Sequence, residues 1–324
     1  MNGPVLSLTD LSVDFPTPDA TISAVDRVSL TVAPGELVGL VGESGCGKST
    51  LASAVMGLLP PQARVSGSVV LEGEEIIGAS AGHLRSLRGA RMAMIFQDPS
   101  TSLDPTFSIG SQVADAIKAH QHIPAAQARA QAIRLLQQVG IPDAARRYNT
   151  PPHRFSGGMK QRVVIAAALA NNPRLLIADE PTTALDVTIQ AQILRLMASL
   201  AKEHHTGVLL ITHDLGVVAQ VCQRVGVMYA GQLVEEAPVA ALFATPQHPY
   251  TKALLAALPS NVAEGERLSV IPGSVPDLAS QLPGCRFLNR CPLAFEPCQN
   301  RPSPVTVGPT RVACWAVEPS PDHS

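Results

Sequence analysis

The chain has 324 residues, of which 46% are hydrophobic and 15% charged, so it can form a large core and does not resemble a disordered protein. Its formal net charge is −2 and only 3% of its residues are aromatic, and both values argue against a nucleic-acid-binding protein. The longest apolar run, 163–170, is too short to span a membrane. A secretory signal would require positive charge near its start, but no Lys or Arg precedes Arg27. We therefore expect a cytosolic protein, whose membrane role would come through a partner subunit.

Strands and helices are predicted to alternate along the first two thirds of the chain. Short apolar or alternating runs predict strands at 5–13, 29–32, 36–41, 175–178 and 208–212. Helical spacing predicts helices at 51–59, in two segments of 112–140 separated at Pro124, at 159–171 and at 187–202. This alternation is typical of an α/β core with a mainly parallel sheet. The composition shifts after about residue 238, so we predict one domain over 1–242 and a smaller module over 243–324.

A glycine-rich loop follows the strand predicted at 36–41. Gly42-Glu43-Ser44-Gly45-Cys46-Gly47-Lys48-Ser49 matches the pattern G-x-x-x-x-G-K-[ST] in full, and a helix is expected after it. The glycines let backbone N–H groups surround phosphates, and the helix presents its positive end to the same anion. We expect Lys48 to reach the β and γ phosphates and the Ser49 hydroxyl to bind Mg²⁺. The loop from Gly42 to Thr50 alone indicates an NTPase of unspecified kind.

Cys46 occupies a position that this motif leaves free. A thiol near a helix N-terminus can have a lowered pKa and be reactive. We interpret Cys46 instead as a residue that fills the loop.

Two carboxylates end the apolar run 175–178, which has the form of a Walker B strand. The acids Asp179 and Glu180 would emerge at the C-terminal edge of the sheet, where ligands bind in such folds. We expect Asp179 to hold Mg²⁺ and Glu180 to orient or deprotonate the attacking water. His213 ends the next predicted strand and could face the γ-phosphate, whereas Gln97, after the apolar run 93–96, carries no signal by itself.

The segment Phe155-Ser156-Gly157-Gly158-Met159-Lys160-Gln161-Arg162 resembles the signature of ATP-binding-cassette (ABC) ATPases, LSGGQ followed by Gln-Arg. In that family this loop binds the γ-phosphate of ATP held by the opposite subunit, so the resemblance implies two cassettes that enclose two nucleotides. Phe155 and Met159 depart from the usual Leu and Gln, but the Ser-Gly-Gly donors remain. The resemblance implies an α/β P-loop cassette with a RecA-like core and a helical subdomain inserted at about residues 100–160.

The same resemblance implies further roles by position. Gln97 matches the Q-loop, which touches Mg²⁺ and signals to the membrane subunit. Ala184-Leu185-Asp186 matches the D-loop between the cassettes, and His213 matches the switch histidine. Phe15 is the best candidate for the aromatic ring that stacks on adenine.

The tail resembles the C-terminal extension of oligopeptide and dipeptide importer ATPases, most closely the dipeptide-permease type. His248-Pro249-Tyr250-Thr251 and the cysteines after Gly284 carry this resemblance. It implies an ATP-hydrolysing subunit that energises import of dipeptides, oligopeptides or a related small solute, at the cytoplasmic face of the cell membrane. Relatives with this tail also move nickel, glutathione and other small solutes.

The implied partners are a second ABC ATPase subunit, by family habit a paralogue in a heterodimer, two transmembrane permease subunits and, indirectly, an extracytoplasmic solute-binding protein. The alternative is a soluble ABC ATPase that acts on nucleic acid or ribosomes. Such proteins usually carry two cassettes, a coiled-coil insertion or CxxC zinc pairs, and this chain shows none of these features. A non-enzymatic ATP-binding regulator is disfavoured because Glu180 is intact.

Four cysteines lie close together near the end of the sequence, at Cys285, Cys291, Cys298 and Cys314. Four thiolates can hold either tetrahedral zinc or a [4Fe–4S] cluster. Structural zinc usually uses two C-x2–4-C pairs, which this C-x5-C-x6-C-x15-C spacing lacks. The resemblance to the importer ATPases favours a [4Fe–4S] cluster, while buried thiols without a ligand remain an alternative.

Overall fold

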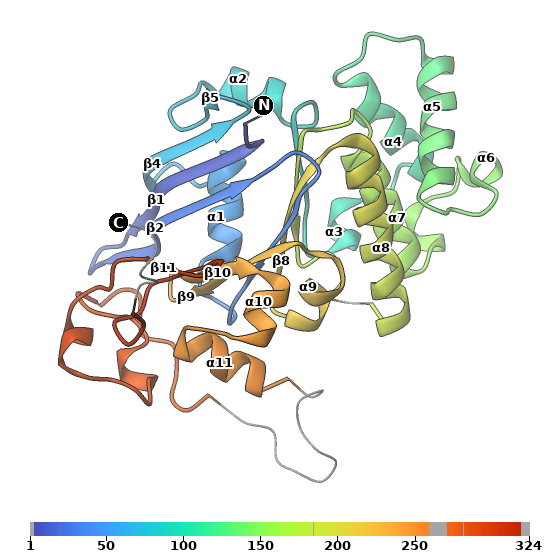
Figure 1. Cartoon of the computed structure of the whole chain (residues 1–324). Coiled ribbons are helices and arrows are strands. Elements are labelled where there is room, and N and C mark those ends of the chain that lie inside the picture. Colours follow the sequence, from blue (N-terminus) through green and yellow to red (C-terminus); the bar gives the residue numbers. More distant parts are fainter. Residues whose placement is uncertain (1–2, 184, 259–270, 281, 319–324) are drawn as a thin grey trace. The chain divides into compact units, whose positions relative to one another are not determined.

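The computed structural model describes residues 3–183, 185–258, 271–280 and 282–318. The chain forms two compact units whose segments alternate along the sequence (Figure 1). The first unit contains residues 1–6, 32–37 and 71–210, and the second contains 7–31, 38–70 and 211–324. The sequence-based division at residue 242 stays a prediction.

Two parallel strands form the centre of the first unit. Strand β6 (Met92–Ile95) pairs with β7 (Leu175–Asp179) in a register that sets Ile95 opposite Ala178. All five residues of β7 are buried, as expected for a strand covered on both faces. Strand β8 (Gly207–Thr212) is equally buried along its length. The strands predicted at 175–178 and 208–212 are therefore confirmed.

A group of helices accounts for most of the remaining first unit. Helix α4 (Ile109–Lys118) packs against both α5 (Ala125–Gln138) and α7 (Gly157–Ala168) (Figure 1). Pro124 directly precedes α5. Proline is tolerated at the start of a helix, where its missing N–H removes no hydrogen bond of the helix. The other elements are β5 (Glu74–Glu75), α2 (Ala81–Leu87), α3 (Pro99–Ser102), α6 (Ala144–Arg147), η1 (Pro152–Arg154) and α8 (Val187–His204).

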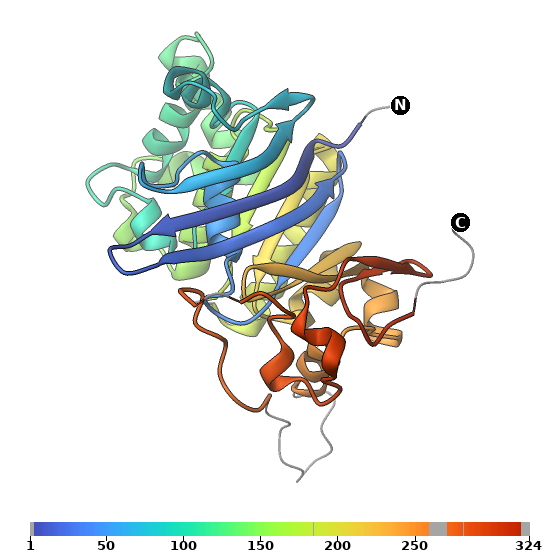
Figure 2. The ribbon, with the colours of Figure 1, turned by 90° about the vertical axis from the view of Figure 1, so that its left-hand side faces the viewer.

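The second unit contains strands from the N-terminal part of the chain. Strands β2 (Thr21–Val32), β1 (Leu6–Pro16) and β4 (Arg64–Leu71) lie in the order β2-β1-β4 (Figure 2). From Val28 to Val32, buried residues of β2 alternate with half-buried or exposed ones, as in a sheet with one buried face. The long hairpin contains the two strands that the sequence predicted at 5–13 and 29–32.

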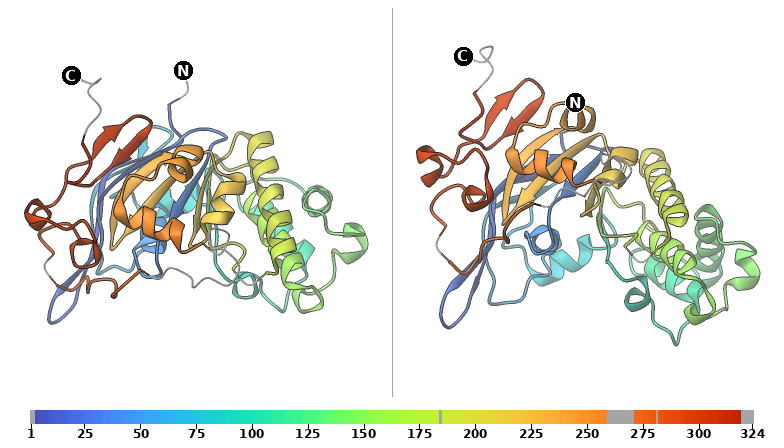
Figure 3. Two further views of the ribbon diagram at one scale, coloured as in Figure 1. Left: turned by 60° about the horizontal axis from the view of Figure 1, so that its bottom comes forward. Right: turned by 90° about the horizontal axis from the view of Figure 1, so that it is seen from below.

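A second group of strands in this unit joins the phosphate-loop strand to the tail. It has the order β11-β12-β10-β9-β3, in which β3 (Leu37–Val41) is parallel to β9 (Arg224–Tyr229). Strand β10 (Gln232–Pro238) pairs antiparallel with both β9 and β12 (Thr310–Val312). The hairpin of β11 (Val305–Val307) and β12, red in Figure 3, thereby extends the sheet. The parallel pairs confirm the predicted α/β class, and the antiparallel addition was not predicted.

Short helices and aromatic rings fill the core around the tail. The helices are α1 (Lys48–Val55), α9 (Leu215–Val221), α10 (Val239–Ala244), α11 (Pro249–Ala256), η3 (Leu288–Arg290) and η4 (Glu296–Gln299). The Tyr229 ring lies 4.6 Å from the Tyr250 ring and 5.1 Å from the Phe287 ring, measured between centroids. All three side chains are buried. In the part of the chain that the structure describes, no helix combines the length and apolar character of a membrane span.

A buried histidine caps helix α11 and should make the stability of this region depend on pH. His248 Nδ1 accepts a hydrogen bond from the Tyr250 N–H at 3.0 Å, so the ring must be neutral. Burial lowers the pKa of His248 to about 3. Because the unfolded chain then binds the proton more tightly, the stabilising contribution is present above the ordinary histidine pKa and is lost as the pH falls below it.

The expected loss of free energy of unfolding between pH 7 and pH 5 is about 2 kcal/mol. The variant His248→Asn keeps a capping acceptor but cannot titrate, so its stability should change less over the same range. Urea unfolding at the two pH values measures the difference. Equal pH slopes for His248→Asn and wild type would contradict the prediction.

Candidate nucleotide site

The predicted phosphate loop forms a turn between β3 and α1 in the second unit. The residue after β3 is Gly42, and α1 begins at Lys48, so the loop has the strand–loop–helix context that its motif requires. Gly42, Gly45 and Gly47 have φ values of +156°, +78° and +100°, which other residues rarely adopt. The side chains of Ser44 and Ser49 are exposed and Thr50 is half-buried. The loop therefore presents its backbone and hydroxyl groups to solvent.

The loop lysine lies within the loop itself. Lys48 is 6% exposed, and its Nζ donates to the carbonyl oxygens of Gly42 at 2.8 Å and Glu43 at 3.0 Å. These bonds hold the ammonium group on the inner side of the turn. Phosphate oxygens would give the ammonium group charged acceptors in place of neutral carbonyls, which makes stronger hydrogen bonds.

Cys46 fills the space beneath the loop, as the sequence interpretation proposed. Its side chain is 1% exposed, and a Cβ built on Gly42 would lie 2.8 Å from its Sγ. Burial raises the pKa of the Cys46 thiol, although the nearby Lys48 acts in the opposite direction. The thiol is therefore protonated at neutral pH, and a reactive role is not supported.

Two further predicted residues belong to the same unit as the loop. Phe15 is half-buried and lies inside β1, which extends to Pro16, beyond the end of the strand predicted at 5–13. His213 is exposed and directly follows β8. The next residue, Asp214, caps α9 by accepting from the Gly216 N–H at 2.7 Å.

In the first unit, Gln97 and Glu180 meet at the C-terminal edge of the parallel strands. Ile95 and Ala178 lie opposite each other in the sheet, and Gln97 and Glu180 each follow one of them by two residues. Gln97 Nε2 donates to Glu180 Oε2 at 3.1 Å, and Thr183 Oγ1 donates to the same oxygen at 2.9 Å. Glu180 has φ +46°, an uncommon backbone conformation for a residue with a side chain. Two donors therefore fix one carboxylate oxygen at a strand end.

Asp179, the last residue of β7, is 8% exposed. Its carboxylate, the Ser49 hydroxyl and the Gln97 amide are hard oxygen donors of the kind that Mg²⁺ accepts. Magnesium bound with nucleotides takes only one or two protein carboxylates and completes its shell with phosphates and water. Each of these groups therefore has the chemistry of a magnesium ligand.

The signature-like segment begins helix α7. Ser156 is the N-cap, and its Oγ accepts from the Met159 N–H at 3.4 Å. Ser156 and Gly157 are exposed, while the substituted residue Phe155 is 6% exposed and anchors the chain before the helix. A Cβ on Gly158 would lie 2.6 Å from Ile189 Cγ2 in α8, so the glycine permits close packing of the two helix starts.

The predicted D-loop lies next to this segment. Asp186 caps α8 by accepting from the Ile189 N–H at 2.9 Å, and a Cβ on Gly157 would meet Leu185 at 3.4 Å. Ala184, the first residue of that prediction, lies outside the described residues. The first unit thus brings the signature segment and the D-loop together.

The four tail cysteines are neighbours in the fold. The Cys285 N–H donates to the Cys298 carbonyl at 2.9 Å, and Cys285, Cys291, Cys298 and Cys314 are all free thiols. Burial raises the pKa of Cys285 to about 11, with smaller contributions from the other three thiols. Within the described ranges, no group of three or more His, Cys, Asp or Glu side chains is arranged to hold a metal ion. The arrangement therefore gives no support to the predicted [4Fe–4S] cluster.

Three residues that the sequence did not assign to the site contact residues that it did. Thr183 hydrogen-bonds to Glu180 as described above. Arg290 pairs with the Glu43 carboxylate, and the Tyr250 hydroxyl accepts from the Glu43 N–H. Tyr250 belongs to a tail motif that carried the family resemblance, and Arg290 directly precedes one of its cysteines, Cys291. No local pattern indicated that either residue reaches the phosphate loop.

Comparisons with known proteins identify the family of the chain. The family model described as "ABC transporter" matches residues 25–183, and the model "Oligopeptide/dipeptide transporter, C-terminal region" matches residues 234–298. Among solved structures, a dimeric ATP-binding cassette in a post-hydrolysis state with ADP and Pi has a TM-score of 0.65 at 28% identity, covering 72% of this chain and 98% of its own. A cassette from Clostridium perfringens, part of an ABC transporter complex, gives a TM-score of 0.64 at 28% identity, with 75% and 91% covered.

Several curated proteins are similar over almost their whole length. A probable peptide ABC transporter ATP-binding protein of Sinorhizobium fredii is 48% identical, covering 96% of this chain and 94% of its own. The oligopeptide transport ATP-binding protein OppD of Salmonella typhimurium is 46% identical, with 96% and 93% covered. The dipeptide transport ATP-binding protein DppD of Bacillus subtilis is 46% identical, with 99% and 97% covered. The chain therefore belongs to the ATP-binding subunits of ABC transporters, in the group that carries the oligopeptide/dipeptide C-terminal region.

Proposed function

We propose that this ABC ATPase energises the import of dipeptides or oligopeptides. The observation that carries the proposal is the similarity to peptide-transport ATP-binding proteins over 96% or more of this chain, tail included. The peptide-transport names of these relatives favour an importer over an ATPase that acts on nucleic acid or ribosomes.

The phosphate loop is proposed to bind the phosphates of ATP. It consists of Gly42, Glu43, Ser44, Gly45, Cys46, Gly47, Lys48, Ser49 and Thr50. Lys48 would move its hydrogen bonds from the two loop carbonyls to the β and γ phosphates. Ser49, Asp179 and Gln97 are the proposed magnesium ligands. These residues would hold Mg²⁺, whose positive charge would offset the negative charge that develops on the phosphate oxygens.

Glu180 is proposed as the group that prepares water for attack on the γ-phosphate. Its carboxylate would accept a proton from the water, and the donors Gln97 and Thr183 fix the position of one of its oxygens. His213, exposed at the end of β8, is proposed to contact the γ-phosphate. Phe15 is proposed to stack on adenine.

A second cassette is proposed to complete the site. Ser156 and Gly157 present hydroxyl and N–H groups to solvent at the start of the 12-residue helix α7, where an anion is favoured. Together with Gly158, they would bind the γ-phosphate of ATP held by another cassette, with Asp186 at the same interface. A similar cassette was solved as a dimer, which supports this arrangement. The second cassette is proposed to be a paralogue.

The remaining proposed partners are two transmembrane permease subunits and, indirectly, an extracytoplasmic solute-binding protein. The chain would then work as a peripheral protein at the cytoplasmic face of the cell membrane. The names of its relatives as peptide import or peptide transport proteins support these proposals.

Deletion of the gene in its own organism tests the substrate class. Uptake of a labelled dipeptide and tripeptide should be lost, and a plasmid copy of the chain should restore it. Uptake of labelled nickel and of a free amino acid in the same cells serves as the control. Loss of nickel uptake with normal peptide uptake would contradict the peptide proposal and leave the ATPase assignment intact.

We also propose that the tail holds a [4Fe–4S] cluster, bound by Cys285, Cys291, Cys298 and Cys314. The proposal rests on the resemblance to the importer ATPases and on the proximity of the four thiols. Protein purified without oxygen should contain about four iron and four sulfide per chain. Cys298→Ser should lose this iron, while Cys222→Ser, at a cysteine outside the group, should keep it. Iron-free protein, or stoichiometric zinc, would contradict the proposal.

A further inference from the structure

An arginine from the C-terminal tail makes a two-point contact with the phosphate loop. Arg290, the last residue of η3, lies next to Cys291 in the sequence. Its Nη1 is 2.7 Å from Glu43 Oε2, and its Nη2 is 3.1 Å from Glu43 Oε1. This pair of parallel hydrogen bonds between charged groups is both strong and directional. The Arg290 side chain is 5% exposed and that of Glu43 is 28% exposed, so water screens the pair only partly.

The Arg290 guanidinium is itself held in place. Its Nε donates to the Pro272 carbonyl at 2.8 Å, and its Nη1 also donates to the Tyr229 hydroxyl at 3.2 Å. The guanidinium carbon lies 5.7 Å from the Tyr229 ring centroid and 6.0 Å from that of Phe287. These contacts fix the orientation of the guanidinium, so Arg290 can in turn fix the Glu43 carboxylate.

A second side chain of the tail supports the same loop residue. The Glu43 N–H donates to the Tyr250 hydroxyl at 3.0 Å, and Tyr250 is buried in α11. Tyr250 therefore holds the backbone of Glu43 while Arg290 holds its carboxylate.

Arg286 supports the loop at another point. It donates to the Ala230 carbonyl, and the neighbouring Gly231 N–H donates to the Cys46 carbonyl at 2.9 Å. Three tail residues thus hold the loop at two places.

The charge of Glu43 makes this contact relevant to nucleotide binding. The Glu43 carbonyl accepts a hydrogen bond from Lys48, the residue assigned to the phosphates. A carboxylate on the same loop opposes the binding of a polyanion unless a cation compensates it. The motif leaves position 43 free, so its charge is not required by the loop itself.

We propose that Arg290 is a positioning residue for ATP: it neutralises Glu43 and fixes the loop, so that the tail sets the affinity of the phosphate loop for nucleotide. The inference rests on the proposed role of Gly42 to Thr50 in binding ATP phosphates. Because Arg290 acts through Glu43, its removal should affect nucleotide affinity more than the rate of the hydrolytic step.

Calorimetric titration of the full-length chain with Mg²⁺ and a non-hydrolysable ATP analogue tests the proposal. Arg290→Gln should weaken binding by about tenfold, because it leaves the Glu43 charge uncompensated. Glu43→Gln should strengthen binding, since it removes the negative charge and leaves the Arg290 guanidinium near the phosphates. The double variant should bind more tightly than Arg290→Gln alone and lie within about threefold of the wild type.

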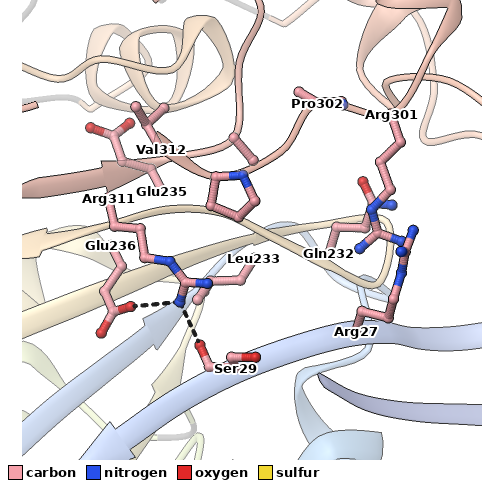
Figure 4. A pocket seen from close by; sticks show the side chains of 12 residues that line it. Arg27, Ser29, Gln232, Leu233, Glu235, Glu236, Arg301, Pro302, Arg311 and Val312 are labelled. Atoms are coloured by element: carbon pink, nitrogen blue, oxygen red, sulfur yellow. Dashed lines mark hydrogen bonds and ion pairs between the residues drawn. The ribbon is translucent and has the colours of Figure 1, made fainter. Parts of the chain in front are cut away.

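The tail provides a matched control. Arg311 also comes from the tail and pairs with an acid of the sheet, with Nη1 3.9 Å from Glu236 Oε2 and 3.3 Å from the Ser29 carbonyl (Figure 4). Its partners lie on β10 and β2 rather than in the phosphate loop, so Arg311→Gln should bind the analogue as the wild type does. Arg290→Lys, which keeps the charge but loses the two-point contact, should lie between the wild type and Arg290→Gln.

The outcomes separate a charge effect from a general loss of structure. If Arg290 only stabilised the fold, the double variant would bind no better than Arg290→Gln, and that result would contradict the proposal. Unchanged affinity in Arg290→Gln would also contradict it, and so would an equal loss in Arg311→Gln. Failure of the wild-type chain to bind the analogue would instead contradict the assignment of the loop, and the inference with it.

Discussion

Replacing Glu180 by Gln should leave nucleotide binding intact and lower ATP hydrolysis by about 100- to 10,000-fold, the usual contribution of a general base. The amide has the size of the carboxylate and can still accept a hydrogen bond from Gln97 or Thr183. It cannot take a proton from water, so the chemical step should fail while the fold and the phosphate loop are unchanged. Phosphate release at saturating MgATP measures the loss.

A second glutamate of the first unit provides the control for this variant. Glu203 is exposed on α8, and Glu203→Gln should hydrolyse ATP at the wild-type rate. Titration with MgATP should give Glu180→Gln a dissociation constant within about threefold of the wild type, because binding precedes proton transfer. Hydrolysis by Glu180→Gln at more than a tenth of the wild-type rate would refute the role of Glu180 as the base.

The parts of the fold that the sequence predicted correctly are those with a strong local pattern. β3, β7 and β8 are short runs of apolar residues, and the phosphate loop is framed by its own glycines. The two helices α4 and α5 were separated correctly because Pro124 interrupts the helical spacing. In each case the signal lies within a few residues of the element that it predicts.

β10 was missed because its stabilising partners are distant in the sequence. It contains Glu235 and Glu236, which are 1% and 9% exposed. Two adjacent acidic residues do not fit the apolar pattern from which a strand is predicted. The Glu235 carboxylate accepts the N–H groups of Gln247 and His248 at 2.8 and 2.9 Å, and Glu236 pairs with Arg224. Buried carboxylates become acceptable only with such partners, which the fold supplies and the local sequence does not show.

The residues of the candidate site also fall into those that a local motif predicts and those that only the fold brings together. The P-loop motif placed Lys48 and Ser49 from local residues, and the resemblance to ABC ATPases added Gln97, which lies 83 residues from its hydrogen-bond partner Glu180. The pair of Glu43 and Arg290 spans 247 residues and belongs to no motif that links them. Only the folded chain shows that the tail reaches the loop.

Replacing Gly47 by Ala should abolish high-affinity ATP binding, with a loss of at least about 100-fold, because the loop can no longer hold its shape. Gly47 has φ +100°, and a Cβ there would lie 2.2 Å from the Ala24 carbonyl oxygen. That oxygen belongs to the backbone of β2, so it cannot turn aside as a flexible side chain would. The loop must shift, and the backbone groups that surround the phosphates shift with it.

The neighbouring Gly45 separates the clash from backbone strain. Gly45 has φ +78°, but a Cβ there would meet nothing within 4 Å. Gly45→Ala therefore carries only the strain of the left-handed conformation, about 1 kcal/mol, and should weaken ATP binding by about tenfold or less. Thermal unfolding without nucleotide and titration with MgATP distinguish the two variants. If Gly47→Ala binds ATP as well as Gly45→Ala, contact with Ala24 does not determine the shape of the phosphate loop.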